Sequence, residues 1–160
     1  MENVIFRTAT IDDLPDIIRM LADDFLGAHR EQHVDPLPES YVRAFKDIDA
    51  DANNHLIVAE LGGEVVGTLQ LTITPSISFQ GGKRASVESV RVEKKLRGAG
   101  IGRKMMLWAI ELARNKGCIS MQLTTNTERQ DAHRFYSELG FKASHVGMKL
   151  SLESGDAKKR

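Results

Sequence analysis

The chain has little cysteine, little proline and no excess of charge of either sign. Its 160 residues include one cysteine, Cys118, so no disulfide can form within it. A single thiol is typical of a reducing compartment, and we expect a cytoplasmic protein. Lys plus Arg and Asp plus Glu both number 22. This balance argues against broad binding to nucleic acid or to an anionic membrane, because both need a basic excess.

Long hydrophobic runs are also missing. No apolar stretch reaches the ~18–20 residues of a bilayer-spanning helix, and the N-terminus, MENVIFRTAT, lacks the pattern of a signal peptide. We therefore expect no membrane association. A hydrophobic share of 41% with 28% charged residues is typical of a globular protein. The length suits a single domain, which we expect at residues 3–151, with a polar tail at 152–160.

The sequence lacks the motifs of several ligand sites. A phosphate loop of the G-x-x-x-x-G-K-[ST] type is absent, and Arg103 stands where a G-x-G-x-x-G motif would need its third glycine. His29 and His33 have helical spacing but no evident third ligand. These absences argue against a nucleotide hydrolase and a dinucleotide oxidoreductase, and we expect no metal site.

The apolar pattern that is present predicts alternating strands and helices. Paired glycines at 62–63 indicate a hairpin, and residues 65–74 alternate in the manner of a half-buried antiparallel strand. Strands are expected at 3–7, 56–60, 65–74, 85–92, 118–124 and 141–150, and helices at about 14–27, 39–48, 101–116 and 127–140. The order β-α-α-β-β-β-α-β-α-β predicts an α/β protein with a mixed sheet rather than regular βαβ units.

The most informative segment is Arg97-Gly98-Ala99-Gly100-Ile101-Gly102, which lies between a predicted strand and a predicted helix. Glycine has no Cβ, so backbone N–H groups can approach a ligand closely. The first turn of a helix adds unpaired N–H groups and a partial positive charge. This combination favours a phosphate-bearing ligand.

Two segments together resemble the GCN5-related N-acetyltransferase (GNAT) family. The first is V-R-V at 90–92 followed by the glycine loop, which fits the family's Q/R-x-x-G-x-G/A signature. The second is Asn126 followed by A-H-R-F-Y-S-E-L-G-F at 132–141. The resemblance implies an acyl-CoA N-acyltransferase fold with splayed central strands. It also implies acetyl-CoA as acyl donor and cosubstrate, with no metal.

The resemblance implies a set of cofactor-binding residues. The glycine loop would wrap the pyrophosphate, and the strand before it would hydrogen-bond the pantetheine arm as a neighbouring strand does. Asn126 would hydrogen-bond the pantetheine arm or order a water molecule, and an equal alternative is that it only forms a turn. His133 would reach the cofactor, and the alternative is that it is a surface histidine. The implied cofactor residues are Val90, Arg91, Val92, Arg97, Gly98, Ala99, Gly100, Ile101, Gly102, Arg103, Asn126 and His133.

Two residues are candidates for catalysis. The resemblance implies that Tyr136 hydrogen-bonds or protonates the departing thiolate, whereas its spacing also fits a core aromatic. An attacking amine must be neutral although alkylamines have a pKa of about 10, so a general base would help. Glu88 is the carboxylate candidate because it lies on the strand that enters the site. Strict alternation puts it on the same face as Val90 and Val92, and a bulge would change that.

The predicted function is transfer of acetyl from acetyl-CoA to a primary amine, on a small molecule or on a protein. The alternative is a regulatory protein that binds acyl-CoA and has little turnover. The resemblance also carries an expectation of a homodimer. The segment at 27–38 is polar, contains two prolines and is expected to help cover the acceptor pocket.

Overall fold

The computed structural model describes residues 3–23 and 27–152. Residues 1–123 form one compact unit and residues 124–160 a second. Among the described residues, no helix has the length and apolar character needed to cross a bilayer.

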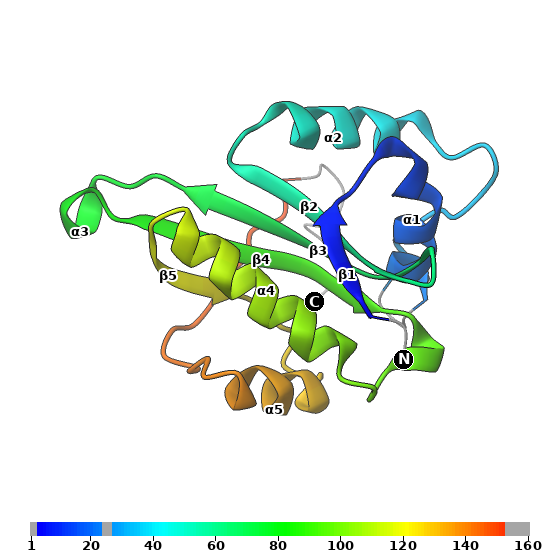
Figure 1. Cartoon of the computed structure of the whole chain (residues 1–160). Coiled ribbons are helices and arrows are strands. Elements are labelled where there is room, and N and C mark those ends of the chain that lie inside the picture. The colour runs from blue at the N-terminus through cyan, green and yellow to red at the C-terminus, as the bar shows by residue number, and fades with distance from the viewer. Residues whose placement is uncertain (1–2, 24–26, 153–160) are drawn as a thin grey trace. The chain divides into compact units, whose positions relative to one another are not determined.

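The first unit is built on a five-stranded sheet (Figure 1). Its strands follow one another in the order β1-β2-β3-β4-β5. Neighbours are antiparallel except β4 and β5, which are parallel. The strands are β1 (Ile5–Thr8), β2 (Asn54–Leu61), β3 (Glu64–Thr74), β4 (Lys83–Val92) and β5 (Cys118–Leu123). The β2–β3 turn uses Gly62 and Gly63 with φ of 60° and 83°, as the predicted hairpin requires.

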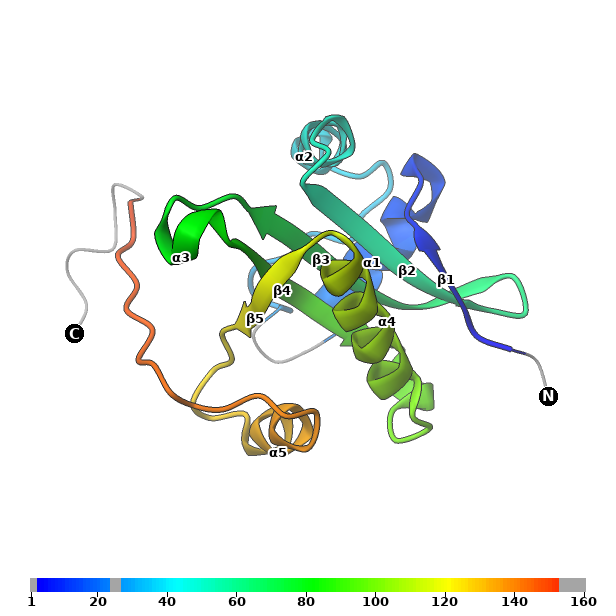
Figure 2. The ribbon, with the colours of Figure 1, turned by 60° about the vertical axis from the view of Figure 1, so that its left-hand side comes forward.

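Helices cover both faces of this sheet (Figures 1 and 2). The helical segments described in this unit are the 3₁₀ turn η1 (Ile11–Asp13), α1 (Leu14–Ala22), α2 (Glu39–Ala50), the short α3 (Ser78–Gly81) at the tip of the β3–β4 connection, the 3₁₀ turn η2 (Lys94–Leu96) and α4 (Ile101–Asn115). The helices α1 and α2 pack on one face, where Ile17, Ile18 and Phe45 form a core cluster with Val58. On the other face, α4 buries Met105 and Met106 against the sheet, and Trp108 meets Phe6 with ring centroids 6.1 Å apart.

The central strand is more buried than the sequence pattern suggests. Leu69, Leu71 and Ile73 are buried on one face, as predicted, but Thr68 on the opposite face is also only 1% exposed. Its hydroxyl donates to the Ile57 carbonyl at 3.0 Å, which satisfies the polar group in the interior. The expected half-buried strand is therefore covered on both faces along residues 65–69.

The loop that was expected at 75–84 contains α3, in which Phe79 and Gln80 have φ of 53° and 58°.

In the second unit, α5 spans Gln130–Glu138. Its N-cap is Arg129, so this helix begins three residues after the expected residue 127. The Gln130 side-chain amide donates to the Thr127 carbonyl at 3.0 Å.

The segment 141–150, where a final strand was expected, has no strand pairing and is irregular backbone with one bend. A strand needs a neighbour to satisfy its backbone groups, and the described part of the second unit, 124–152, contains one helix and no other strand. Its alternating apolar residues Val146, Met148 and Leu150 are 85–93% exposed. The apolar alternation at 141–150 is present in the sequence, but the described residues of this unit contain no second strand with which the segment could pair.

A buried carboxylate ties β1 to the start of the first helix. Asp13 is 6% exposed and accepts from both Arg7 guanidinium nitrogens, Nη1 at 2.7 Å and Nη2 at 2.9 Å. It also accepts from the Thr10 backbone N–H at 2.7 Å. Arg7 reaches Glu60 on β2 at 2.8 Å. The Arg7 hydrogen bonds lower the pKa of Asp13 below its ordinary 3.8, against the opposing effect of burial.

We predict that Asp13→Asn lowers the free energy of unfolding by about 2 kcal/mol at neutral pH, because charge-assisted hydrogen bonds to a buried group are lost. A carboxyl with a lowered pKa stabilises the fold above its ordinary value of 3.8 and loses this effect as the pH falls through its folded-state pKa. Urea unfolding across pH 2–7 should therefore show the two proteins converging at acid pH. The matched control is Asp12→Asn, an exposed neighbour in η1. Equal losses for both variants would contradict the role given to Asp13.

Candidate functional site

A bulge interrupts β4 in the middle of its pairing with β3. Glu88 pairs with Gln70 and Arg91 pairs with Thr68, so Ser89 and Val90 together face one residue of β3. Ser89 takes a φ of 56°, a conformation that is uncommon for a residue other than glycine. The extra residue bends the strand and shifts the alternation of its side chains.

This bulge decides which way Glu88 points. Glu88 lies on the same face of the sheet as its partner Gln70. Val92 pairs with Gly67, which is three residues before Gln70 in β3. Because side chains alternate between faces along a strand, Gly67 and Val92 lie on the opposite face. Strict alternation would put Glu88 and Val92 on one face, and the extra residue of the bulge puts them on opposite faces instead. Glu88 lies on the side of the sheet that α1 and α2 cover.

The strands β4 and β5 separate just before the bulge. Their parallel ladder runs from Lys83 opposite Cys118 to Val87 opposite Leu123. The strand β5 ends there, whereas β4 continues to Val92. Among the described residues of the first unit, the last five residues of β4 therefore have no partner in β5, and Glu88, Arg91 and Val92 pair with β3 alone, as the splayed strands of the predicted fold require.

The glycine loop leads from β4 into α4. Gly98 and Gly100 have φ of 83° and 82°, and Gly100 is the N-cap of α4. A Cβ at either position would meet nothing within 4 Å, so these positions need glycine for their backbone conformation and not for space. Gly102 lies inside the first turn of α4. The N–H groups of that turn have no acceptor within the helix, and residues 97–100 are exposed.

Charged side chains surround the approach to this loop. A hollow of about 410 Å³ is lined by Arg19, Ala22 and Asp23 of the α1 end and by Glu93, Lys94 and Lys95 after β4. Arg19 binds Glu93 at 2.5 Å, and this hydrogen bond lowers the pKa of Glu93. Arg97 donates to the Val92 carbonyl at 3.1 Å and lies 3.7 Å from Asp23. Its side chain thus fastens the loop to β4.

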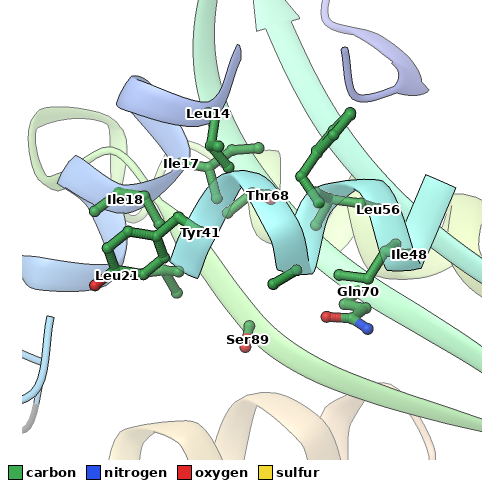
Figure 3. Close-up of a pocket in the computed structure, with 12 residues that line it drawn as sticks. Leu14, Ile17, Ile18, Leu21, Tyr41, Ile48, Leu56, Thr68, Gln70 and Ser89 are labelled. Atoms are coloured by element: carbon green, nitrogen blue, oxygen red, sulfur yellow. The ribbon is translucent and has the colours of Figure 1, made fainter. Parts of the chain in front are cut away.

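A second cavity, of about 130 Å³, lies between the sheet and the helices α1 and α2 (Figure 3). Three polar side chains line it from the sheet: Thr68, Gln70 and Ser89 of the bulge. The remaining lining comes from Leu14, Ile17, Ile18, Leu21, Tyr41, Ala44, Phe45, Ile48 and Leu56. The Tyr41 hydroxyl donates to Glu31 at 3.0 Å and accepts from the Gln32 N–H at 2.9 Å. It therefore holds the segment 27–38 beside the cavity.

In the second unit, Asn126, His133 and Tyr136 have local partners. The Asn126 side chain accepts from the Glu128 N–H at 2.9 Å, and the Asn126 backbone carbonyl lies 2.9 Å from His133 Nε2. These contacts are those of the turn that precedes a helix. The Tyr136 ring packs edge-on against Phe135 and Phe141, with centroids 5.1 Å and 5.9 Å away. Among the described residues, no group of three or more His, Cys, Asp and Glu side chains could hold a metal ion.

Sequence reasoning missed Tyr41, Gln70 and Ser89. The polar positions 68, 70 and 72 of β3 were a usable signal, because they place Gln70 on the face opposite the core residues Leu69 and Leu71. Nothing local in the sequence marks Ser89 as the residue that takes the positive φ.

Comparisons with known proteins agree on one family. The family described as acetyltransferase (GNAT) matches residues 16–141. An aminoalkylphosphonate N-acetyltransferase of Salmonella typhimurium is 36% identical over 114 residues, which cover 69% of this chain and 73% of that protein. A glucosamine 6-phosphate N-acetyltransferase of Trypanosoma brucei brucei is 33% identical over 90 residues, 56% of this chain and 59% of that protein. A crystal structure described as a transcriptional regulator from Bacillus halodurans C-125 is 54% identical, with a TM-score of 0.91 over 93% of this chain and 99% of the other.

Proposed function

The chain belongs to the acetyltransferase (GNAT) family, and from that premise we propose that it moves acetyl from acetyl-CoA to a primary amine by direct attack on the thioester. The observation that supports this most is the bulged end of β4, which extends beyond its pairing with β5 and leads through the glycine loop to α4, whose N-cap is Gly100. We propose further that residues 3–151 act as a single catalytic domain.

The donor would use the backbone from Val90 to Arg103. The end of β4 at Val90, Arg91 and Val92, which lies beyond the last residue pair with β5, would present its backbone to the amides of the pantetheine arm. The glycine loop and the first turn of α4 offer N–H groups to the pyrophosphate. Lys94 and Lys95 are exposed beside the loop and add positive charge for the phosphates.

The chemistry needs a base, a stabilised oxyanion and an acid. The neutral amine nitrogen attacks the thioester carbonyl carbon, and a backbone N–H near Val92 stabilises the resulting oxyanion. The C–S bond then breaks and expels the CoA thiolate. Glu88 takes a proton from the amine, directly or through water, and Tyr136 gives a proton to the thiolate. Asn126 and His133 would support cofactor binding at the start of the helix that carries Tyr136.

The names of the relatives leave small phosphorylated or phosphonate amines as candidate acceptors. The description of the Bacillus halodurans structure favours a second candidate, a regulatory protein that binds acetyl-CoA without turnover. A panel of primary amines, assayed for release of free CoA thiol, separates the two. We expect thiol release with at least one amine. Tight binding of acetyl-CoA without release on any amine, small or on a protein, would favour the regulator.

The loop is tested by Gly100→Ala against Gly63→Ala. The two glycines have φ of 82° and 83°, and neither would bring a Cβ within 4 Å of another atom. Both variants should therefore cost about 1 kcal/mol of stability from backbone strain. Only Gly100→Ala should raise the Kd for acetyl-CoA, by about tenfold or more, because its methyl intrudes where the pyrophosphate would lie. Equal Kd values in calorimetric titrations would refute this location.

The base is tested by Glu88→Gln against Glu64→Gln, an exposed glutamate at the start of β3. At pH 7 the first change should lower kcat/KM for the amine about 100-fold, a typical contribution of general-base catalysis. The deficit should shrink as the pH approaches the amine pKa of about 10, because neutral amine then forms without help. A deficit that is constant across pH 7–10 would assign Glu88 a structural role only.

A further inference from the structure

The cavity beside the bulge indicates what kind of amine the protein accepts. We propose that the acceptor carries an uncharged apolar group of about four or five carbons, or one aromatic ring, which enters this cavity while the amine stays at Glu88. This inference rests on the proposed function, since it assumes that acetyl transfer occurs at the bulge of β4.

The register of the sheet connects the amine to the cavity. Glu88 is exposed, is opposite Gln70 in the ladder and lies on the same face. Gln70 and the neighbouring Ser89 line the cavity. In Figure 3 they lie at the opposite end of the cavity from Leu14 and Ile17. An amine nitrogen held by Glu88 therefore directs its substituent past Gln70 and Ser89 toward the apolar end.

The chemistry of the lining selects against charge. None of the twelve lining residues is charged at neutral pH. The Tyr41 hydroxyl already bonds the Glu31 carboxylate, and the Gln70 amide nitrogen donates to Asn54 at 3.1 Å. A phosphate or phosphonate inside the cavity would lose its hydration without gaining a cation, which is unfavourable. Arg91 is opposite Thr68 in the ladder, but it is not among the lining residues and its Nη1 donates to the Val90 carbonyl at 2.9 Å. The basic side chains of Arg19, Lys94 and Lys95 line the other hollow, near the glycine loop.

The size of the cavity sets the length of the substituent. A volume of about 130 Å³ is close to the roughly 150 Å³ of an apolar protein cavity that binds benzene. The deep end is formed by Leu14, Ile17 and Ile18, all at most 5% exposed. The opening lies near Ala44 and Ser89, which are exposed. A straight chain of about five carbons would reach this buried end, so further carbons would bury no additional apolar surface in the cavity.

The test measures kcat/KM for straight-chain primary amines from ethylamine to heptylamine at saturating acetyl-CoA. These amines share one ammonium group and therefore one basicity, so length is the only variable. We expect kcat/KM to rise about fourfold per methylene up to about five carbons and then to level off. We also expect 2-aminoethylphosphonate to be at least tenfold poorer than n-butylamine. A flat series, or a preference for 2-aminoethylphosphonate, would overturn the proposal.

A matched pair of variants locates the effect in the cavity. Ala44→Leu places three more carbons at the lining of the cavity, whereas Ala50→Leu adds the same carbons at the exposed end of α2, away from the lining. Ala44→Leu should lower kcat/KM for n-pentylamine about tenfold and leave ethylamine within twofold. Ala50→Leu should change neither amine. Equal behaviour of the two variants would place the selectivity elsewhere and refute the proposal.

The outcomes separate this inference from the function on which it rests. Thiol release only with amines that carry a second charged group, such as 2-aminoethylphosphonate, would support acetyl transfer and overturn the apolar acceptor. If no amine releases thiol, the proposed function fails, and the cavity is judged by n-pentylamine binding alone. Shifts of the methyl signals of Ile17, Ile18 and Leu56 that Ala44→Leu abolishes would then support the apolar pocket, and unchanged signals would overturn it.

Discussion

The structure of the candidate site depends on one extra residue in β4. Because Ser89 and Val90 together face one residue of β3, the alternation of side chains changes at that point. Before the bulge, Glu88 lies on the face covered by α1 and α2. After the bulge, Val92 lies on the face covered by α4. An unbulged strand would place the glutamate and the backbone edge differently.

Two further features keep this end of β4 in place. Arg19 of α1 binds Glu93 at the end of the strand, and Arg97 bonds the Val92 carbonyl. These contacts join the first helix, the bulged strand and the glycine loop into one local arrangement. In the proposed function, the donor would use the backbone of this arrangement and the acceptor would use the cavity on the α1 and α2 side.

The sequence predicted the parts that depend on local chemistry. The glycines at 62, 63 and 100 all have positive φ, and the apolar periodicities placed α2, α4 and the strands β1 to β5 within two residues of their bounds. The helix α1 was expected to reach residue 27 but ends at Ala22. It failed where pairing decides the outcome. The face of Glu88 depends on a bulge whose residue, Ser89, has no local signature. The alternating segment at 141–150 has the pattern of a strand without a partner in its unit. The cavity could not be foreseen, because it arises from packing between residues distant in the chain.

The central claim is that the end of β4 beyond its pairing with β5 and the glycine loop receive acetyl-CoA together. Titrating acetyl-CoA into ¹⁵N-labelled protein and recording backbone amide shifts tests this most directly. The account predicts that the largest changes fall at residues 90–92 and 98–103, with little change at the Gly62–Gly63 turn. Acetyl-CoA binding that leaves the amides of 90–92 and 98–103 unperturbed would contradict it.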